Sequence, residues 1–236
     1  MRILAADTST QYCSVSLCEA GDVLPRILCE TTVLAGRRHS EILLSQTRDL
    51  LDAVRLSLNE IDLLAISAGP GSFTGLRVGM ATWKGLAFGL RRPLMAVPTL
   101  DAMARRIGPG ESIACPMLDA RMDEVFAAAY RLRGGVRECL LEPVVAPARE
   151  VIARIPHGAV VFGDGALRYR GVFENAGARV QIPAAEFHVA SAAAVAFEAA
   201  ERLGRGELAD ASAARPIYLR KPQAEVVSEA ARAAAQ

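Results

Sequence analysis

The glycine-rich run from Gly69 to Gly79 holds the residue types that could most directly bind a charged ligand. It reads GPGSFTGLRVG and follows a short apolar segment, residues 63–68, so we predict a buried strand, a tight turn and a helix capped by Ser72. Strand, glycine turn and helix N-terminus are also the parts of a phosphate-binding loop. The glycine spacing, however, is one residue longer than the dinucleotide fingerprint, and no Gly-Lys-Ser/Thr follows. We therefore interpret these glycines as packing positions: without a Cβ atom, they let another part of the backbone approach the helix closely.

The histidines and cysteines of the sequence offer little for metal binding or nucleophilic catalysis. His39, His157 and His188 lie far apart and form no H-x-x-x-H pair. The 5 cysteines form no Cys-x-x-Cys pair and their number is odd, which is typical of reduced thiols in a cytosolic protein. No Gly-x-Ser-x-Gly elbow is present. We predict no metal site and no catalytic residue in this chain.

The elements that would position these residues follow an order that occurs twice. For the first half we predict strands 2–6, 13–18 and 27–33 (the last at a sheet edge), helix 40–56 capped by Ser40, strand 63–68, helix 72–90, strand 94–97 and a helix to residue 107 capped by Thr99. After the turn at residues 108–110 we predict strands 113–118, 125–131 and 136–145, helix 148–155, strand 160–162, helix 166–176 and helix 192–203 capped by Ser191. The first strand of each half ends in an aspartate, Asp7 and Asp119.

This repeated order predicts an internal duplication and two stacked α/β domains, residues 1–107 and 108–236, with the C-terminal tail packing back on the first. A chain of 236 residues is long enough for that arrangement. The net charge of +1 gives no strong overall attraction to nucleic acid or to an anionic membrane. Asp7 comes too early for a secretory signal, and no apolar run reaches the roughly 18 residues of a membrane span. We expect a cytoplasmic protein.

Several short motifs spread over the whole chain carry a family resemblance. Besides GPGSFTGLRVG they are Asp7-Thr8-Ser9, His39-Ser40-Glu41, Leu118-Asp119-Ala120-Arg121 followed by Glu124-Val125-Phe126, Gly163-Asp164-Gly165 and Pro216-Ile217-Tyr218-Leu219-Arg220. Together they closely resemble the bacterial TsaB (YeaZ) family. The resemblance implies a degenerate actin/Hsp70/sugar-kinase-like (RNase H-like) fold with a reduced second domain. It also implies a non-catalytic partner of the related TsaD, which supports attachment of threonylcarbamoyl to N6 of the adenosine 3′ of the anticodon in tRNA.

The resemblance also bears on phosphate and metal binding. In kinases of this fold an acid at the end of the first strand helps to hold magnesium and phosphate, which makes Asp7, Thr8 and Ser9 a vestigial phosphate loop. The alternative is that Asp7 only shapes the turn into the second strand. TsaD holds its metal with two histidines four residues apart, and the matching positions here are Thr99 and Met103, neither of which replaces imidazole. We expect no cofactor in this chain, with ATP and metal on TsaD.

Helices 40–56 and 72–90 are expected to form the partner surface. Helix 72–90 is apolar on nearly all its faces, so its own sheet can cover one face while another needs a separate cover. The resemblance places the TsaD contact on the same two helices. The residues predicted at this interface are His39, Ile42, Leu43, Thr47, Leu50, Phe73, Leu76, Gly79 and Trp83. The alternative is that both helices are sandwiched within the fold.

The expected partners are TsaD, in a heterodimer, and TsaE, with a homodimer through the same surface when the chain is alone. The chain would reach tRNA only through the complex, and no membrane contact is expected. The rival function is an active enzyme of the same fold, either metallopeptidase-like or a small ATP-dependent kinase. The missing H-x-x-x-H pair argues against the first, and the missing second phosphate loop argues against the second.

Overall fold

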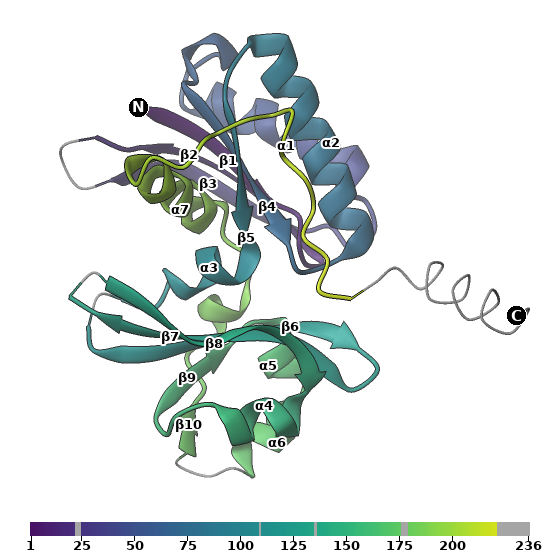
Figure 1. The fold of residues 1–236 in the computed structure, drawn as a ribbon. Coiled ribbons are helices and arrows are strands. Elements are labelled where there is room, and N and C mark those ends of the chain that lie inside the picture. Colours follow the sequence, from purple (N-terminus) through teal and green to yellow (C-terminus); the bar gives the residue numbers. More distant parts are fainter. Residues whose placement is uncertain (22–24, 109, 135, 176–178, 221–236) are drawn as a thin grey trace, which may run out of the picture.

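The computed structural model describes residues 1–21, 25–108, 110–134, 136–175 and 179–220, arranged in two lobes that are each built on a five-stranded sheet (Figure 1). The first sheet has the order β3-β2-β1-β4-β5, with bounds β1 (Arg2–Asp7), β2 (Tyr12–Glu19), β3 (Arg26–Leu34), β4 (Leu63–Gly69) and β5 (Leu94–Pro98). The second has the order β10-β9-β6-β7-β8, with bounds β6 (Ser112–Arg121), β7 (Glu124–Arg133), β8 (Val136–Pro147), β9 (Ala159–Phe162) and β10 (Val180–Gln181).

The two sheets have the same topology. In the first, β1 pairs antiparallel with β2 and parallel with β4, and in the second, β6 pairs antiparallel with β7 and parallel with β9. The outer strands repeat the correspondence, because β2–β3 and β7–β8 are antiparallel whereas β4–β5 and β9–β10 are parallel. The predicted duplication and the actin/Hsp70/sugar-kinase-like fold class are therefore confirmed, and β3 lies at a sheet edge as expected.

Helices cover both faces of the first sheet. The helices α1 (His39–Ala53) and α2 (Phe73–Leu90) pack on one face, and α7 (Ala192–Gly204) packs on the other (Figure 1). Strand β1 shows why, since Leu4 and Ala6 join the core beneath α1 and α2 while Ile3 and Ala5 join the core beneath α7. Strands buried on both faces read as continuous apolar runs, which is how β1 and β4 appear in the sequence.

Helix α7 packs on the first sheet although it follows all the strands of the second sheet in the sequence. Its N-terminus is held by side chains of the first lobe, because the Glu30 carboxylate accepts hydrogen bonds from Ala193 N at 2.9 Å and Ser191 Oγ at 3.0 Å. Ser191 also caps the helix as predicted, accepting from Ala194 N. The division into residues 1–107 and 108–236 groups α7 with the second lobe, whereas its main contacts are with β1, β2, β4 and β5.

In the second lobe, α4 (Ala148–Arg154), α5 (Asp164–Arg168) and α6 (Arg170–Glu174) build a core with one face of the sheet. The opposite face packs on α3 (Thr99–Ala104), which lies between the lobes. Two predictions are corrected here. The helix predicted over 166–176 is two short helices, and the one predicted to reach residue 107 ends at Ala104. The single turns η1 (Leu58–Glu60) and η3 (Ala185–His188) and the strand β10 have no counterpart among the predicted elements.

Two of the four predicted caps are wrong. Ser72 caps α2 by accepting from Gly75 N at 3.2 Å, as expected. Ser40 lies inside α1, because the helix already begins at His39, whose ring nitrogen Nε2 lies 3.1 Å from the carbonyl oxygen of Tyr12. Thr99 is the first residue of α3 rather than its cap, and its hydroxyl instead accepts from Gly69 N at 3.0 Å. The His39 ring and the Thr99 hydroxyl thus join the starts of α1 and α3 to neighbouring strands.

A buried ion cluster joins the two lobes. Arg137 on β8 donates to both carboxylate oxygens of Glu198 on α7, at 2.8 and 2.7 Å, and Glu198 is fully buried. Burial by itself would raise the pKa of Glu198, but the hydrogen bonds and charge of Arg137, with the charges of Arg105 and Arg202, lower it. A buried carboxylate needs this number of partners to stay ionised. The cluster therefore fixes α7 against the second sheet.

The C-terminal segment makes a second connection between the lobes. Ile217 N donates to the carbonyl of Ala68, at the end of β4, at 2.7 Å. Arg220 donates to the carbonyl of Ala120 at 2.9 Å and forms an ion pair with Glu124, both in the second lobe. Residues 214–220, which we call the strap, thus connect the first sheet to the β6–β7 hairpin.

Candidate functional site

The turn between β1 and β2 holds the first candidate site, Asp7, Thr8 and Ser9. One oxygen of Asp7, Oδ1, accepts from Ser9 N at 2.8 Å, Ser9 Oγ at 2.6 Å and Ser67 Oγ at 3.1 Å. Thr8 Oγ1 donates to the carbonyl of Gly75 at 2.9 Å. Desolvation raises the pKa of Asp7, although the Ser9 and Ser67 hydrogen bonds oppose it. The hydroxyls that could meet a phosphate are therefore bonded within the fold.

The glycines of α2 explain how this turn is closed. A Cβ atom added at Gly75 would lie far inside contact distance of the Thr8 carbonyl, and one added at Gly79 would clash with Thr8 Oγ1. A Cβ atom at Gly71 would meet the Ser9 carbonyl in the same way. The first two turns of α2 thus lie directly against the Asp7 turn. These contacts support the interpretation of the run as a packing device.

The equivalent turn of the second lobe surrounds its aspartate with arginines. Asp119 Oδ1 accepts from Arg121 N at 2.9 Å, and Asp119 Oδ2 lies 3.2 Å from Arg121 and 3.5 Å from Arg168. Asp164 accepts from Asp119 N at 3.0 Å, and burial, with the Asp119 charge, raises the pKa of Asp164. Over the described part of the chain, no group of three or more His, Cys, Asp or Glu side chains is arranged to hold a metal ion.

The histidines and the two positions matched to metal ligands all serve packing or turns. His188 is buried, accepts from Gly163 N at 3.2 Å through Nδ1 and lies 3.2 Å from the Pro183 carbonyl through Nε2. Thr99, at the start of α3, is buried against the end of β4, and Met103 packs in the core between the lobes. His157 is exposed on a turn.

The thiols are poorly suited to nucleophilic chemistry. Burial raises the pKa of Cys13 and of Cys18 to about 12, and it raises the pKa of Cys115 as well. A thiol with a raised pKa is protonated at neutral pH and reacts slowly. The exposed Cys139 also has a raised pKa, from partial burial and from its hydrogen bond with Glu142.

A hollow of about 370 Å³ lies between the lobes and is a further candidate for ligand binding. Its polar side chains already pair with one another or with the ion cluster. Tyr130 donates to Asp101 at 2.6 Å, and Arg137 is bound by Glu198. Burial and the Asp101 charge raise the pKa of Tyr130. The hollow therefore presents mainly apolar surface, including Ile217 of the strap.

Most of the residues predicted at the partner interface lie in the core of this chain. The buried ones are His39, Leu43, Thr47, Leu50, Leu76, Gly79 and Trp83. Of the other two, Phe73 is 38% exposed and Ile42 is partly buried. The reason is that a helical stripe of apolar residues marks the side that meets the helix's own sheet. The periodicity of the sequence predicted the helices, but the residues chosen from it for the interface lie mostly on the faces that pack on the sheet.

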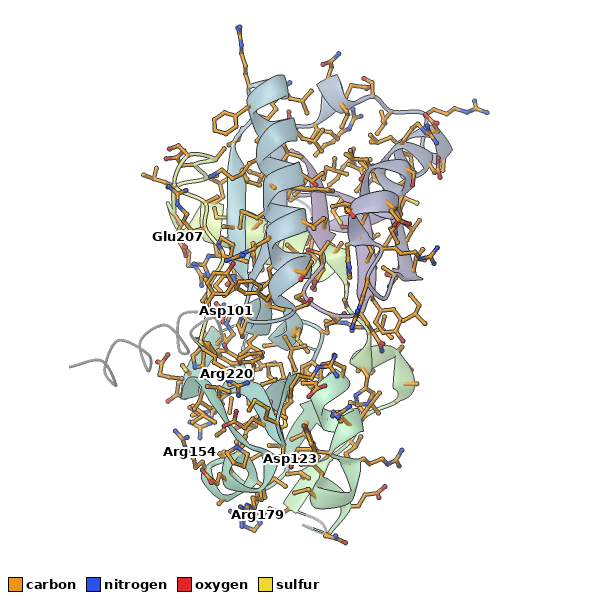
Figure 2. All side chains as sticks on the ribbon, turned by 90° about the vertical axis from the view of Figure 1, so that its right-hand side faces the viewer. Asp101, Asp123, Arg154, Arg179, Glu207 and Arg220 are labelled. Atoms are coloured by element: carbon orange, nitrogen blue, oxygen red, sulfur yellow. The ribbon has the colours of Figure 1, made fainter. Side chains whose placement is uncertain are left out.

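The described residues leave the outward faces of the two helices uncovered. Figure 2 shows α1 and α2 side by side along the first lobe. Leu44 on α1 is 53% exposed and Phe88 on α2 is 61% exposed. Among the described residues, no atom lies within 4 Å of a Cβ atom added at Gly85 or Gly89, so the backbone of α2 is open at these two glycines. Ile42 packs against the core beneath the helix. We therefore call the surface made by Leu44, Phe73, Ala81, Gly85, Phe88 and Gly89 the outer helix face.

Sequence reasoning missed one group of residues beside this face. The strap brings Tyr218 onto the first turns of α2, where its ring centroid lies 5.1 Å from that of Phe73. Arg77 stacks on Phe73 in turn. The available signal was the Pro216–Arg220 motif, which carried the family resemblance without suggesting a site.

Comparison with known proteins agrees with this geometry. Residues 31–227 match the protein-family model described as TsaD: tRNA N6-adenosine threonylcarbamoyltransferase, which makes the chain a member of that family. It is 33% identical to the tRNA threonylcarbamoyladenosine biosynthesis protein TsaB of Escherichia coli K12, over 93% of this chain and 95% of that protein. Within the family, the chain belongs to TsaB. The Bacillus subtilis 168 TsaB is 26% identical over 95% of this chain and 96% of its own length.

A solved structure supports the same assignment. YeaZ from Pseudomonas aeruginosa superposes with a TM-score of 0.75 at 32% identity, covering 92% of this chain and 99% of that one. The predicted TsaB (YeaZ) family is therefore confirmed. Among the residues that the structure describes, no helix combines the length and the apolar character needed to cross a bilayer.

Proposed function

We propose that this chain is the subunit that binds TsaD and supports transfer of a threonylcarbamoyl group to N6 of the adenosine 3′ of the anticodon in tRNA, without supplying a catalytic group. The observation that carries the proposal is the closed Asp7 turn. In a chain of the TsaB family, the hydroxyls and carboxylate at the expected phosphate position are bonded to one another and packed against α2. Such a turn serves the fold rather than a substrate.

The outer helix face supports the binding part of the proposal. Large apolar side chains such as Leu44 and Phe88 are exposed on adjacent helices. Beside them Gly85 and Gly89 leave the backbone open to close approach by another helix. An exposed apolar face on adjacent helices is typical of a surface that another protein covers. TsaD is the occupant that the TsaB family suggests.

The remaining parts of the proposal follow from this role. ATP and metal are bound by TsaD, and TsaE joins the complex. The tRNA is contacted through the complex rather than by this chain alone, in the cytoplasm. An isolated chain pairs with a second copy through the outer helix face, so TsaD competes with the homodimer. Sedimentation across a concentration series tests the last point, and a strict monomer at every concentration contradicts it.

The central test is binding to the TsaD of the same organism. We expect Phe88→Asp to weaken binding strongly, because it places a charge in the covered face. The matched control is Leu167→Asp, on an exposed side chain of the second lobe. Normal binding by Phe88→Asp would remove the outer helix face from the proposal. Failure of the unaltered chain to bind TsaD, or to support transfer in a reconstituted reaction, would overturn the function itself.

A further inference from the structure

Arg77 lies at the edge of the outer helix face with its guanidinium held in a fixed orientation. Its Cζ atom is 3.7 Å from the centroid of the Phe73 ring, one helical turn earlier, and 5.8 Å from that of Tyr218. Its Nε donates to Tyr218 Oη at 3.0 Å. The two rings are tilted by 38° and their centroids are 5.1 Å apart. Stacking and one hydrogen bond thus fix the plane of the guanidinium without using its outer nitrogens.

Those outer nitrogens have no bonding partner within the described residues. Among those residues, no hydrogen bond or ion pair involves an Nη atom of Arg77, and the bond from Nε to Tyr218 Oη is its one polar contact. Arg137 and Arg202, by contrast, are bound by Glu198 and Asp101. The side chain of Arg77 is already fixed in one conformation while its Nη atoms remain accessible. Binding a partner therefore costs less side-chain conformational entropy. Arg77 is prepared to bind an anionic group from outside the chain.

The surroundings indicate what kind of anion. The two residues that stack on or bond to the guanidinium, Phe73 and Tyr218, carry no charge. The other cations of the helix and the strap are already engaged. Lys84 and Arg215 donate to the Ala214 carbonyl at 3.2 and 2.8 Å, and Arg220 pairs with Glu124. Nucleic acid is bound by several cations that neutralise successive phosphates, and this site offers one. A single planar fork beside apolar surface matches one carboxylate of a protein.

We propose that Arg77 binds an aspartate or glutamate side chain of the protein that covers the outer helix face. The inference rests on the proposed function, which makes that protein TsaD. Tyr218 is then a positioning residue, because its ring and hydroxyl hold the guanidinium from a segment 141 residues away in the sequence. The strap therefore contributes to partner recognition as well as to joining the lobes.

The test compares binding of full-length variants to TsaD by titration calorimetry, after circular dichroism has shown that each is folded. Arg77→Gln should raise the dissociation constant by about tenfold or more, as expected for loss of a desolvated charge pair. Tyr218→Phe keeps the ring and removes the hydrogen bond, so its effect should be smaller. The matched control is Arg170→Gln, on an exposed arginine of α6 paired only with Glu174. It should bind as the unaltered chain does.

A zero-length cross-link identifies the partner group. Arg77→Lys places an amine at the site, and a carbodiimide should join it to one TsaD carboxyl group, located by mass spectrometry. Normal binding by Arg77→Gln, or cross-linking to no TsaD acid, would overturn the inference while leaving TsaD binding intact. A cross-link to a second copy of this chain, or tRNA binding lost in Arg77→Gln, would overturn it in favour of another ligand. If the unaltered chain does not bind TsaD, the proposed function fails and this inference fails with it.

Discussion

The Asp7 turn and the Asp119 turn occupy the same place in two sheets of identical topology, and they accommodate their carboxylates by opposite means. Asp7 is buried and meets the hydroxyls of Ser9 and Ser67. Asp119 meets the exposed guanidinium groups of Arg121 and Arg168. The first turn is held by packing and by hydrogen bonds from hydroxyl groups. The second is held mainly by charge pairs to arginines, with one hydrogen bond from Tyr169 Oη at 3.3 Å.

The difference shows that a duplicated backbone can keep an aspartate for its turn geometry alone. In both turns the carboxylate accepts from the backbone N–H two residues later, at 2.8 and 2.9 Å. That bond is the shared element, and it is the ordinary Asx turn. What surrounds it is free to differ, because neither carboxylate has to meet a substrate under the proposed function.

The largest effect is expected from filling the space between α2 and the Asp7 turn. Gly75→Ala should destabilise the chain by more than about 3 kcal/mol, because the new methyl group meets the Thr8 backbone rather than a movable side chain. Gly85→Ala is the control on the same helix. It should add up to about 1 kcal/mol of stability, since nothing lies near it and alanine favours helix. Urea denaturation measures both, and equal effects would mean that the approach at Gly75 is not a tight one.

The second-largest effect is expected from replacing the aspartates, and it should differ between the Asp7 turn and the Asp119 turn. Asp7→Ala leaves the Ser9 amide and two buried hydroxyls without their acceptor, which should cost about 1–3 kcal/mol. Asp119→Ala removes ion pairs to the exposed Arg121 and Arg168 and hydrogen bonds from Arg121 N and Tyr169 Oη. It should cost less than Asp7→Ala, because the two arginines remain in water when their partner is removed. A larger loss for Asp119→Ala in the same denaturation assay would reverse the comparison.

The pH dependence of stability gives a smaller but more specific signal. The pKa of Asp7 is raised in the folded state, so folding favours its protonated form and its contribution to stability falls as pH rises through the folded pKa. Asp7→Asn cannot titrate and keeps an acceptor oxygen. The free energy of unfolding of Asp7→Asn, minus that of the unaltered chain, should therefore increase from about pH 4 to pH 7. A difference that stays flat or falls would mean that Asp7 is not a desolvated carboxylate.

The smallest effect is expected on the transfer reaction itself. An essential catalytic group supplies a factor of about 10² or more. Asp7→Asn should fall well short of that loss in a reconstituted reaction with TsaD, once normal assembly has been shown. A hundredfold drop with assembly intact would give Asp7 a chemical role and contradict the proposed function.

Local sequence patterns predicted the helices and strands but not which elements each of them packs against. The turn and cap at Ser72 and the order of the elements along the chain follow from short-range rules. The same rules give the correspondence between Asp7 and Asp119. The alanine-rich helix 192–203 has a pattern that would suit either sheet, so its place on the first could not be read from the sequence. The same limit applies to α1 and α2, whose apolar stripes gave the inner face, and to Tyr218, which reaches Arg77 across most of the chain length.

The late return of the chain to the first sheet has a consequence for the order in which the protein is made. During synthesis the strands of the first sheet emerge early, but the face that holds Ile3, Ala5 and Val97 is covered only when α7 follows. The strap at the end of β4 comes later still. The first lobe therefore cannot be completed as an independent unit, and one apolar face of its sheet stays uncovered in the nascent chain until residues 192–204 have left the ribosome.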